Sequence, residues 1–294
     1  MLWVVFTLFS SWMYCIQSEL NKRFKINGFK LNTLRALFSA CMMVPLIPFM
    51  EWPQVPAYYL VIILEGAISA VGMMVQYNLA ARHNGRIANL HQPISIMLTF
   101  VFWLIWDQSQ RLLLIENPDK AIGILIAFVI FISSLQFIRK NDIGLQILMS
   151  VIPVAVLYAL MSVIGKIAME SGETLLPIAL NFVFLSNISM FLISLPVFLS
   201  QRMNRPKRNI TLFKIDGHLF KAASSIAFFH TFSWVLISLA IILTPNPAYP
   251  GFIGGLAPVW FMIYYKIRKI DDDSNPIAGL FLSLASLILI FVLQ

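Results

Sequence analysis

Glu65 has the clearest capacity for chemistry, because it is a carboxylate inside the apolar stretch LVIILEGAISAVG (60–72). Holding a charged side chain at the centre of a bilayer costs about 2.5–3.5 kcal/mol or more, so this carboxylate should face a partner or water. Gly72 and Gln76 share its helical face. Two interpretations stay open: Glu65 exchanges protons or binds a cationic substrate, or it is a structural acid hydrogen-bonded to a neighbouring helix.

Two histidines lie in apolar stretches. His91 lies close to Asn89 and Gln92, and His230 shares a helical face with Trp234. Imidazole titrates near neutral pH and could relay protons, although a structural hydrogen-bonding function is equally open. Neither histidine has a Cys or Asp at ligand spacing, so we expect no metal site.

Aromatic side chains recur in the same stretches. A carboxylate surrounded by rings could hold an organic cation through cation–π contacts. Aromatic residues of membrane proteins also form belts at the lipid interface, which is the alternative interpretation. The candidate cavity aromatics are Trp12, Tyr14, Tyr77, Tyr158, Trp234, Tyr249 and Trp260.

The pattern Y-x3-S-x3-K-x5-G occurs twice, beginning at Tyr14 and again at Tyr158, with Lys22 and Lys166 at its lysine positions. The four-residue spacing places Tyr, Ser and Lys on one helical stripe. Each lysine either extends to the membrane interface or helps to gate one end of a cavity. Each tyrosine either anchors its helix or faces the bundle interior.

The elements that must position these residues are transmembrane helices. The chain has 294 residues, of which 59% are hydrophobic and only 12% charged, and its mean hydropathy is +0.82. Soluble domains carry about 25% charged residues, so this composition indicates a bilayer. A span needs about 20 mostly apolar residues. Ten segments qualify: 2–20, 32–50, 57–80, 86–106, 121–138, 143–168, 174–200, 218–242, 246–265 and 276–293.

The basic residues indicate an orientation. The net charge of +8 comes mostly from Lys and Arg assigned to alternate loops and helix ends, Arg35 among them, with Arg111, Lys120 and Lys166 on the other side. Because Lys and Arg concentrate in cytoplasmic loops, both termini are predicted to be non-cytoplasmic. The expected location is the cell (plasma or inner) membrane, and the basic charge needs no nucleic-acid partner.

The two halves of the chain repeat each other. Beyond the two Tyr–Ser–Lys stripes, Gln92-Pro93-Ile94 aligns with Ala257-Pro258-Val259, and weaker matches follow in order. Residues 1–140 and 141–294 are therefore predicted to be two five-helix repeats. Five spans per repeat require opposite orientations, which is the inverted-topology architecture of many secondary transporters. Pro93 and Pro258 could break their helices near the cavity.

With these features the sequence resembles the drug/metabolite transporter superfamily, of the ten-helix EamA-like type. The resemblance covers the whole chain and depends on Lys22, Lys166, Leu34-Arg35-Ala36 and the two Pro-containing segments in their order. It implies a central cavity lined by helices 1, 3, 4, 6, 8 and 9, with helices 5 and 10 peripheral, and transport rather than catalysis. Asp107 and Lys266 stand where relatives often carry Glu.

The predicted function is secondary active transport of a small polar or cationic metabolite by alternating access, with proton coupling as an option. An amino acid, a nucleoside-like cofactor and a quaternary amine are the candidate substrates, and translocation of a lipid-linked head group is the alternative. We expect no enzyme activity, because the apolar stretches show no nucleophile motif or metal-ligand motif and Glu65 is their only deep acid. No cofactor is expected, and the chain could be a monomer or a homodimer.

Overall fold

A computed structural model describes residues 1–82, 91–138, 145–203, 217–269 and 276–293, and throughout these ranges the chain is helical without strands. The all-α prediction is therefore confirmed for the described residues. The elements are α1 (Leu2–Phe24), α2 (Gly28–Met43), the 3-10 helix η1 (Val44–Phe49), α3 (Pro56–Arg82), α5 (His91–Trp106), α6 (Gln108–Glu116), α7 (Pro118–Ile138), α8 (Leu145–Met169), α9 (Leu175–Met203), α10 (Gly217–Leu243), α11 (Ala248–Gly254), α12 (Ala257–Arg268) and α13 (Pro276–Val292).

Within the described ranges, five helical segments are long and apolar enough to cross a membrane. Two shorter apolar helices accompany them, His91–Trp106 and Gly279–Val292. Long apolar helices of this kind fit an integral membrane protein. The five segments are Gly28–Phe49, Pro56–Asn78, Val151–Met169, Leu175–Leu199 and Gly217–Leu243.

One predicted membrane span and one predicted connection differ from the structure. The segment 246–265 is divided into α11 and α12, and Pro258 lies in the first turn of α12, where a missing backbone N–H costs nothing. The predicted connection 107–120 contains the short helix α6. Asp107 caps α6, because its carboxylate accepts hydrogen bonds from the backbone N–H of Ser109 at 2.9 Å and of Gln110 at 3.4 Å.

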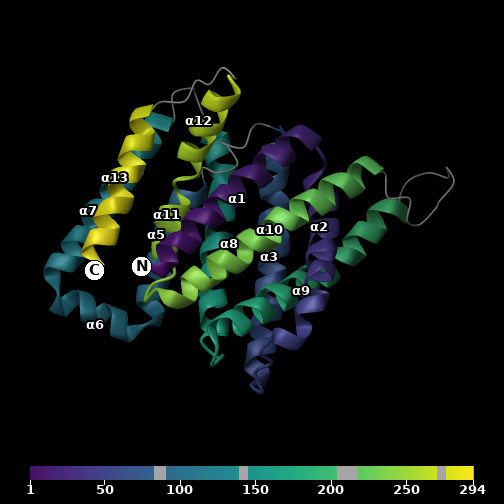
Figure 1. Ribbon diagram of the computed structural model, residues 1–294, viewed down its shortest axis with the longest axis horizontal. Coiled ribbons are helices and arrows are strands. Elements are labelled where there is room, and N and C mark those ends of the chain that lie inside the picture. The colour runs from purple at the N-terminus through teal and green to yellow at the C-terminus, as the bar shows by residue number, and fades with distance from the viewer. Residues whose placement is uncertain (83–90, 139–144, 204–216, 270–275, 294) are drawn as a thin grey trace.

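The helices pack as a bundle with one separate pair at its edge. Helix α1 lies along α10, α3 along α8 and α2 along α9, while α2 also contacts α10 and α3 also contacts α9. Helix α5 packs on α8, and α1 packs on α11 and α12. Figure 1 shows α7 and α13 side by side at one edge, with α6 running across the end of the molecule where both termini lie.

Arg35 corrects the charge assignment. It was counted among loop and helix-end charges, but it lies within α2 and has no exposed surface. Its guanidinium donates to Oδ1 of Asn32 at 2.8 Å and to Oδ1 of Asn187, on α9, at 3.3 Å. Its Nη2 atom also contacts the sulfur atoms of Met73 and Met190 at 3.2 and 2.7 Å. Arg35 therefore joins α2 to α3 and α9 inside the bundle.

Glu51 closes the end of the bundle where α9 begins. Its carboxylate accepts hydrogen bonds from the backbone N–H of Glu173 at 2.6 Å and of Thr174 at 2.9 Å, and from the Thr174 hydroxyl at 2.6 Å. Partial desolvation opposes ionisation, but these three bonds outweigh it and hold the pKa of Glu51 below its ordinary value. The carboxylate thus supplies the N-terminal cap of α9 from a distant part of the chain.

Replacing Glu51 should weaken this cap. We expect Glu51→Gln to lower the free energy of unfolding by about 1 kcal/mol at neutral pH, the usual effect of losing an N-cap. Because the folded-state pKa is lowered, the contribution is complete above the unfolded pKa of about 4.3 and disappears as the pH falls through the folded value. Thermal unfolding across acidic pH measures this. The control Glu173→Gln keeps the backbone donor and should unfold like the wild type. Equal stability of all three proteins at neutral pH would contradict the cap.

Candidate functional site

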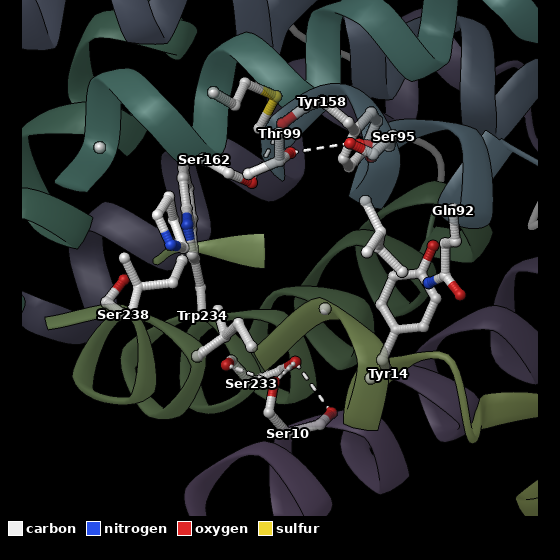
Figure 2. Close-up of a pocket in the computed structure, with 18 of the residues that line it drawn as sticks. Ser10, Tyr14, Gln92, Ser95, Thr99, Tyr158, Ser162, Ser233, Trp234 and Ser238 are labelled. Atoms are coloured by element: carbon white, nitrogen blue, oxygen red, sulfur yellow. Dashed lines mark hydrogen bonds between the residues drawn. The ribbon is translucent and has the colours of Figure 1, made fainter. Parts of the chain in front are cut away.

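A cavity of about 210 Å³ lies at the centre of the bundle. Its wall comes from α1, α3, α5, α8, α10 and α11, together with Phe182 of α9. These are the helices that the family resemblance implies, since α11 belongs to the ninth predicted segment. Figure 2 shows hydroxyl groups from several helices around the cavity, with Trp234 and Ser238 on one side and Tyr14 and Gln92 on the other.

Tyr14 and Tyr158, which begin the two copies of the repeated pattern, meet at one side chain. The amide nitrogen of Gln76 donates to the Tyr14 hydroxyl, and the Tyr158 hydroxyl donates to the amide oxygen of the same Gln76. The ring of His91 lies 4.5 Å from the ring of Tyr158. Helices α1, α3, α5 and α8 therefore converge on one polar cluster in the cavity wall.

Glu65 lines the same cavity and has 1% of its surface exposed. The Ser69 hydroxyl, one turn further along α3, donates to its carboxyl group at 2.5 Å. In the described part of the chain, its other oxygen, Oε2, is buried without a hydrogen-bond partner, and so is the Ser186 hydroxyl on α9. Glu65 thus has the features of both predicted interpretations: it faces the cavity, and it is hydrogen-bonded within the helix bundle.

Helix α10 contributes His230 and Trp234, as well as the unpredicted Ser238, to the opposite part of the wall. The helix is held against α1 by a reciprocal contact in which the Ser10 hydroxyl donates to the Ser233 carbonyl at 2.8 Å. The Ser233 hydroxyl donates to the Ser10 carbonyl at 3.0 Å. Two small residues allow this close approach of the helices.

Other predicted site residues do not line the cavity. Trp12 is 46% exposed on the outside of α1. Trp260 on α12 donates its indole N–H to the Ser11 hydroxyl at 2.8 Å, so it supports the wall from behind. Pro93 is buried in the first turn of α5 and does not break that helix, because the first turn tolerates proline. Asn89 lies outside the described residues.

The two repeated lysines have different surroundings. Lys166 is 4% exposed, and its ammonium donates to the carbonyl oxygens of Ile241 at 3.3 Å and Thr244 at 2.9 Å, at the C-terminal end of α10. It also pairs with Glu170 at 3.2 Å and lies 5.4 Å from the ring centroid of Trp103. Lys22 is exposed, and its ammonium lies 3.5 Å from the Tyr265 hydroxyl and 5.5 Å from the centroid of that ring. Lys166 therefore does not extend into solvent, as the interfacial interpretation required.

Sequence reasoning missed three residues of this region. Arg35 was counted with the charges at a helix end, and its full burial among the helices was not expected. Trp103 and Ser238 were not considered, because nothing in the sequence tells which face of an apolar helix is turned inward. Among the described residues, no group of His, Cys, Asp and Glu is arranged to hold a metal ion.

Comparisons with known proteins support the fold alone. No protein-family model matches the sequence, and no curated protein matches it. One solved structure, described as the crystal structure of a protein, is similar with a TM-score of 0.58 and 11% sequence identity. The match covers 99% of this chain and 97% of that one. The whole chain thus adopts an arrangement of helices that also occurs in a solved protein.

Lys166 should contribute much more to stability than Lys22. We expect Lys166→Met to lower the free energy of unfolding by about 1.5–3 kcal/mol, the usual range for hydrogen bonds to a charged group. The matched change Lys22→Met should alter it by less than about 0.5 kcal/mol, as for other exposed positions. Thermal unfolding of the purified variants in detergent provides the comparison. Equal effects of the two substitutions would show that the buried contacts of Lys166 contribute nothing to stability.

Proposed function

We propose that the protein is a secondary transporter that moves a small polar solute across the cell membrane by alternating access. The observation that carries this proposal is the cavity in which Tyr14 and Tyr158, equivalent residues of the two halves, share Gln76. A cavity with polar groups between two similar halves is the arrangement in which rocking of one half against the other exposes a solute alternately to each side.

The helix packing supports two inverted five-helix repeats with ten spans. We pair α1 with α8, α2 with α9, α3 with α10, α5 with α11 and α12, and α7 with α13. If each helix is replaced by its partner in this pairing, the α1–α10 contact becomes the α8–α3 contact, and the α2–α10 contact becomes the α9–α3 contact. The same exchange converts α5–α8 into the contact of α11 and α12 with α1, and each of these contacts is present. The α2–α9 and α7–α13 contacts map onto themselves.

The distribution of charge supports non-cytoplasmic termini. At the end of the bundle where the termini lie, acids dominate: Glu51, Asp107, Glu116, Asp119, Glu170 and Glu173. The opposite end carries Lys22, Arg23, Lys25, Lys30, Lys221, Lys266, Arg268 and Lys269. Removing Arg35 from the loop charges leaves this asymmetry intact, and the positive end belongs in the cytoplasm.

Glu65 is the proposed coupling residue. It is a carboxyl group in the cavity wall, and a deeply buried ionisable group in a membrane helix is typically functional. The candidate substrates are amino acids, nucleoside-like compounds and quaternary amines.

Replacing Glu65 should remove coupling to protons. In proteoliposomes loaded with members of these three solute classes, we expect pH-dependent uptake by the wild type. In Glu65→Gln we expect a loss of the pH dependence with at least about tenfold slower uptake, typical for loss of a proton-transfer group. Glu173→Gln, a carboxylate outside the cavity, is the matched control. Unchanged rate and pH dependence in Glu65→Gln would remove Glu65 from the mechanism, and absence of uptake of every solute would contradict transport.

The orientation can be tested with single cysteines. In a Cys41→Ser background, which removes the exposed native thiol, Lys266→Cys and Glu116→Cys place thiols at exposed positions on opposite ends. A membrane-impermeant maleimide should label only Glu116→Cys in intact cells and both variants after lysis. The opposite pattern would overturn the orientation, and labelling of both in intact cells would contradict a membrane-spanning bundle.

A further inference from the structure

His230, Trp234 and Ser238 form a stripe on α10 that is suited to hold a ring-shaped solute. They follow one another at intervals of four residues, so they share one helical face, and all three line the cavity. The Trp234 ring lies 5.1 Å from the His230 ring and 6.2 Å, edge-on, from the Phe182 ring. These neighbours hold the indole in place, so it offers a fixed surface for stacking.

Several polar atoms of the cavity wall have capacity for a ligand. Within the described part of the chain, Nε2 of His230, Oγ of Ser238 and Oε1 of Gln17 have no hydrogen-bond partner. The three side chains are only 5%, 1% and 3% exposed, and all belong to the cavity wall. A buried polar atom without a partner costs about 1–3 kcal/mol, so a hydrogen-bonding solute in the cavity relieves this cost.

The charges around the cavity do not favour a cation. Glu65 is the only residue with a formal charge among the described lining residues. The buried Arg35 lies on α2, which packs on α3, and its Nη2 atom contacts the sulfur of Met73, about two turns from Glu65 along α3. The charges of these two buried residues sum to zero when Glu65 is ionised, and the positive charge of Arg35 remains when Glu65 is protonated. Neither state gives the net negative field that holds a cation.

The cavity does not favour an anion either. The Arg35 side chain is fully buried, and its donors are directed to Asn32, Asn187 and two methionine sulfurs instead of the cavity. The described lining contains hydroxyl, amide, imidazole and indole groups but no lysine or arginine. A phosphate or carboxylate would therefore enter without a cationic partner, which is costly in a low-dielectric site.

We propose that the cavity binds an uncharged ring compound with several hydroxyl or amide groups, the chemistry shared by nucleosides and monosaccharides. The ring stacks on Trp234, and His230 and Ser238, on the same face of α10, bond its polar edge. The volume of about 210 Å³ is below the roughly 300–1,000 Å³ of sites for drug-sized ligands, so it fits one small solute. The inference rests on the proposed function for the route by which the solute reaches the cavity.

A matched series of ligands tests the charge requirement. Adenosine, 5′-amino-5′-deoxyadenosine and adenosine 5′-monophosphate share base and sugar but are neutral, cationic and anionic at neutral pH. Glucose distinguishes a sugar ring from a nucleoside. Equilibrium binding to the full-length protein in nanodiscs should show adenosine or glucose binding at least about tenfold more tightly than both charged compounds, corresponding to about 1.4 kcal/mol. Tightest binding of a charged compound, or no binding of adenosine and glucose, would overturn the proposal.

Two pairs of variants test the assigned wall. Trp234→Ala should weaken binding of the preferred neutral ligand by about tenfold or more, because base–aromatic stacking is worth about 1–3 kcal/mol. Trp12→Ala, on the exposed outside of α1, should leave it unchanged. Ser238→Ala should weaken binding severalfold, whereas Ser224→Ala, on the exposed part of α10, should not. Binding that is equal to wild type in Trp234→Ala and Ser238→Ala would overturn the site.

A third experiment separates this proposal from the transport proposal. The nanodisc measurement reports binding without movement, and uptake of the same ligand into proteoliposomes reports movement. Binding of a neutral ring compound without uptake would support the site and contradict transport. Uptake of a charged solute that the neutral compounds do not inhibit would support transport and overturn the site.

Discussion

The arrangement of the cavity depends on a guanidinium with no exposed surface. Arg35 must place its donors on acceptors inside the bundle, because removing one partner of a buried charge costs about 3–5 kcal/mol. It finds them on α2 and α9 and packs on a methionine of α3. These contacts fix α3, and α3 carries Glu65, Gln76 and Tyr77 into the cavity wall. One structural charge thus helps to fix the helix that carries these three residues of the wall.

The polar groups of the wall take their hydrogen-bond partners from both halves of the chain. Gln76 has a donor and an acceptor on one amide, and it uses each for a tyrosine from a different half of the chain. The reciprocal serine contact between α1 and α10 joins the halves again, on another side of the cavity. Between membrane helices, such hydrogen bonds restrict the relative position of the helices more than apolar contacts do, because each donor must meet an acceptor. The halves are therefore joined by hydrogen bonds, and the proposed alternating access would have to exchange these bonds for others.

The sequence predicted the features that follow from the length and periodicity of apolar segments and from the energetic cost of burying a charge. Apolar length predicted helices, the cost of a buried carboxylate predicted an inward Glu65, and the repeated Tyr–Ser–Lys pattern brought attention to Tyr14 and Tyr158. It could not predict rotation of one helix against another, so Trp12 was placed in the cavity and Ser238 was overlooked. Arg35 was misassigned because a charge near a helix start looks the same in sequence whether it extends to water or is buried among amides. The division into α11 and α12 depends on packing of Gly255 on Phe131, where a Cβ atom would come within 2.5 Å of the ring.

The two ends of the bundle are held by different contacts, although the sequence pattern makes them equivalent. At one end, Lys166 donates to the last carbonyls of α10 and pairs with Glu170, and Glu51 caps α9. At the other, among the described residues, Arg23 pairs with Glu19 at 3.5 Å and donates to the Tyr264 hydroxyl at 2.8 Å, and the Tyr265 hydroxyl donates to Glu19 at 3.1 Å. Charge-assisted hydrogen bonds are therefore present at both ends. If the halves exchange conformations as proposed, opening the first end must break the bonds between Lys166 and the last turn of α10, where the helix dipole favours a cation.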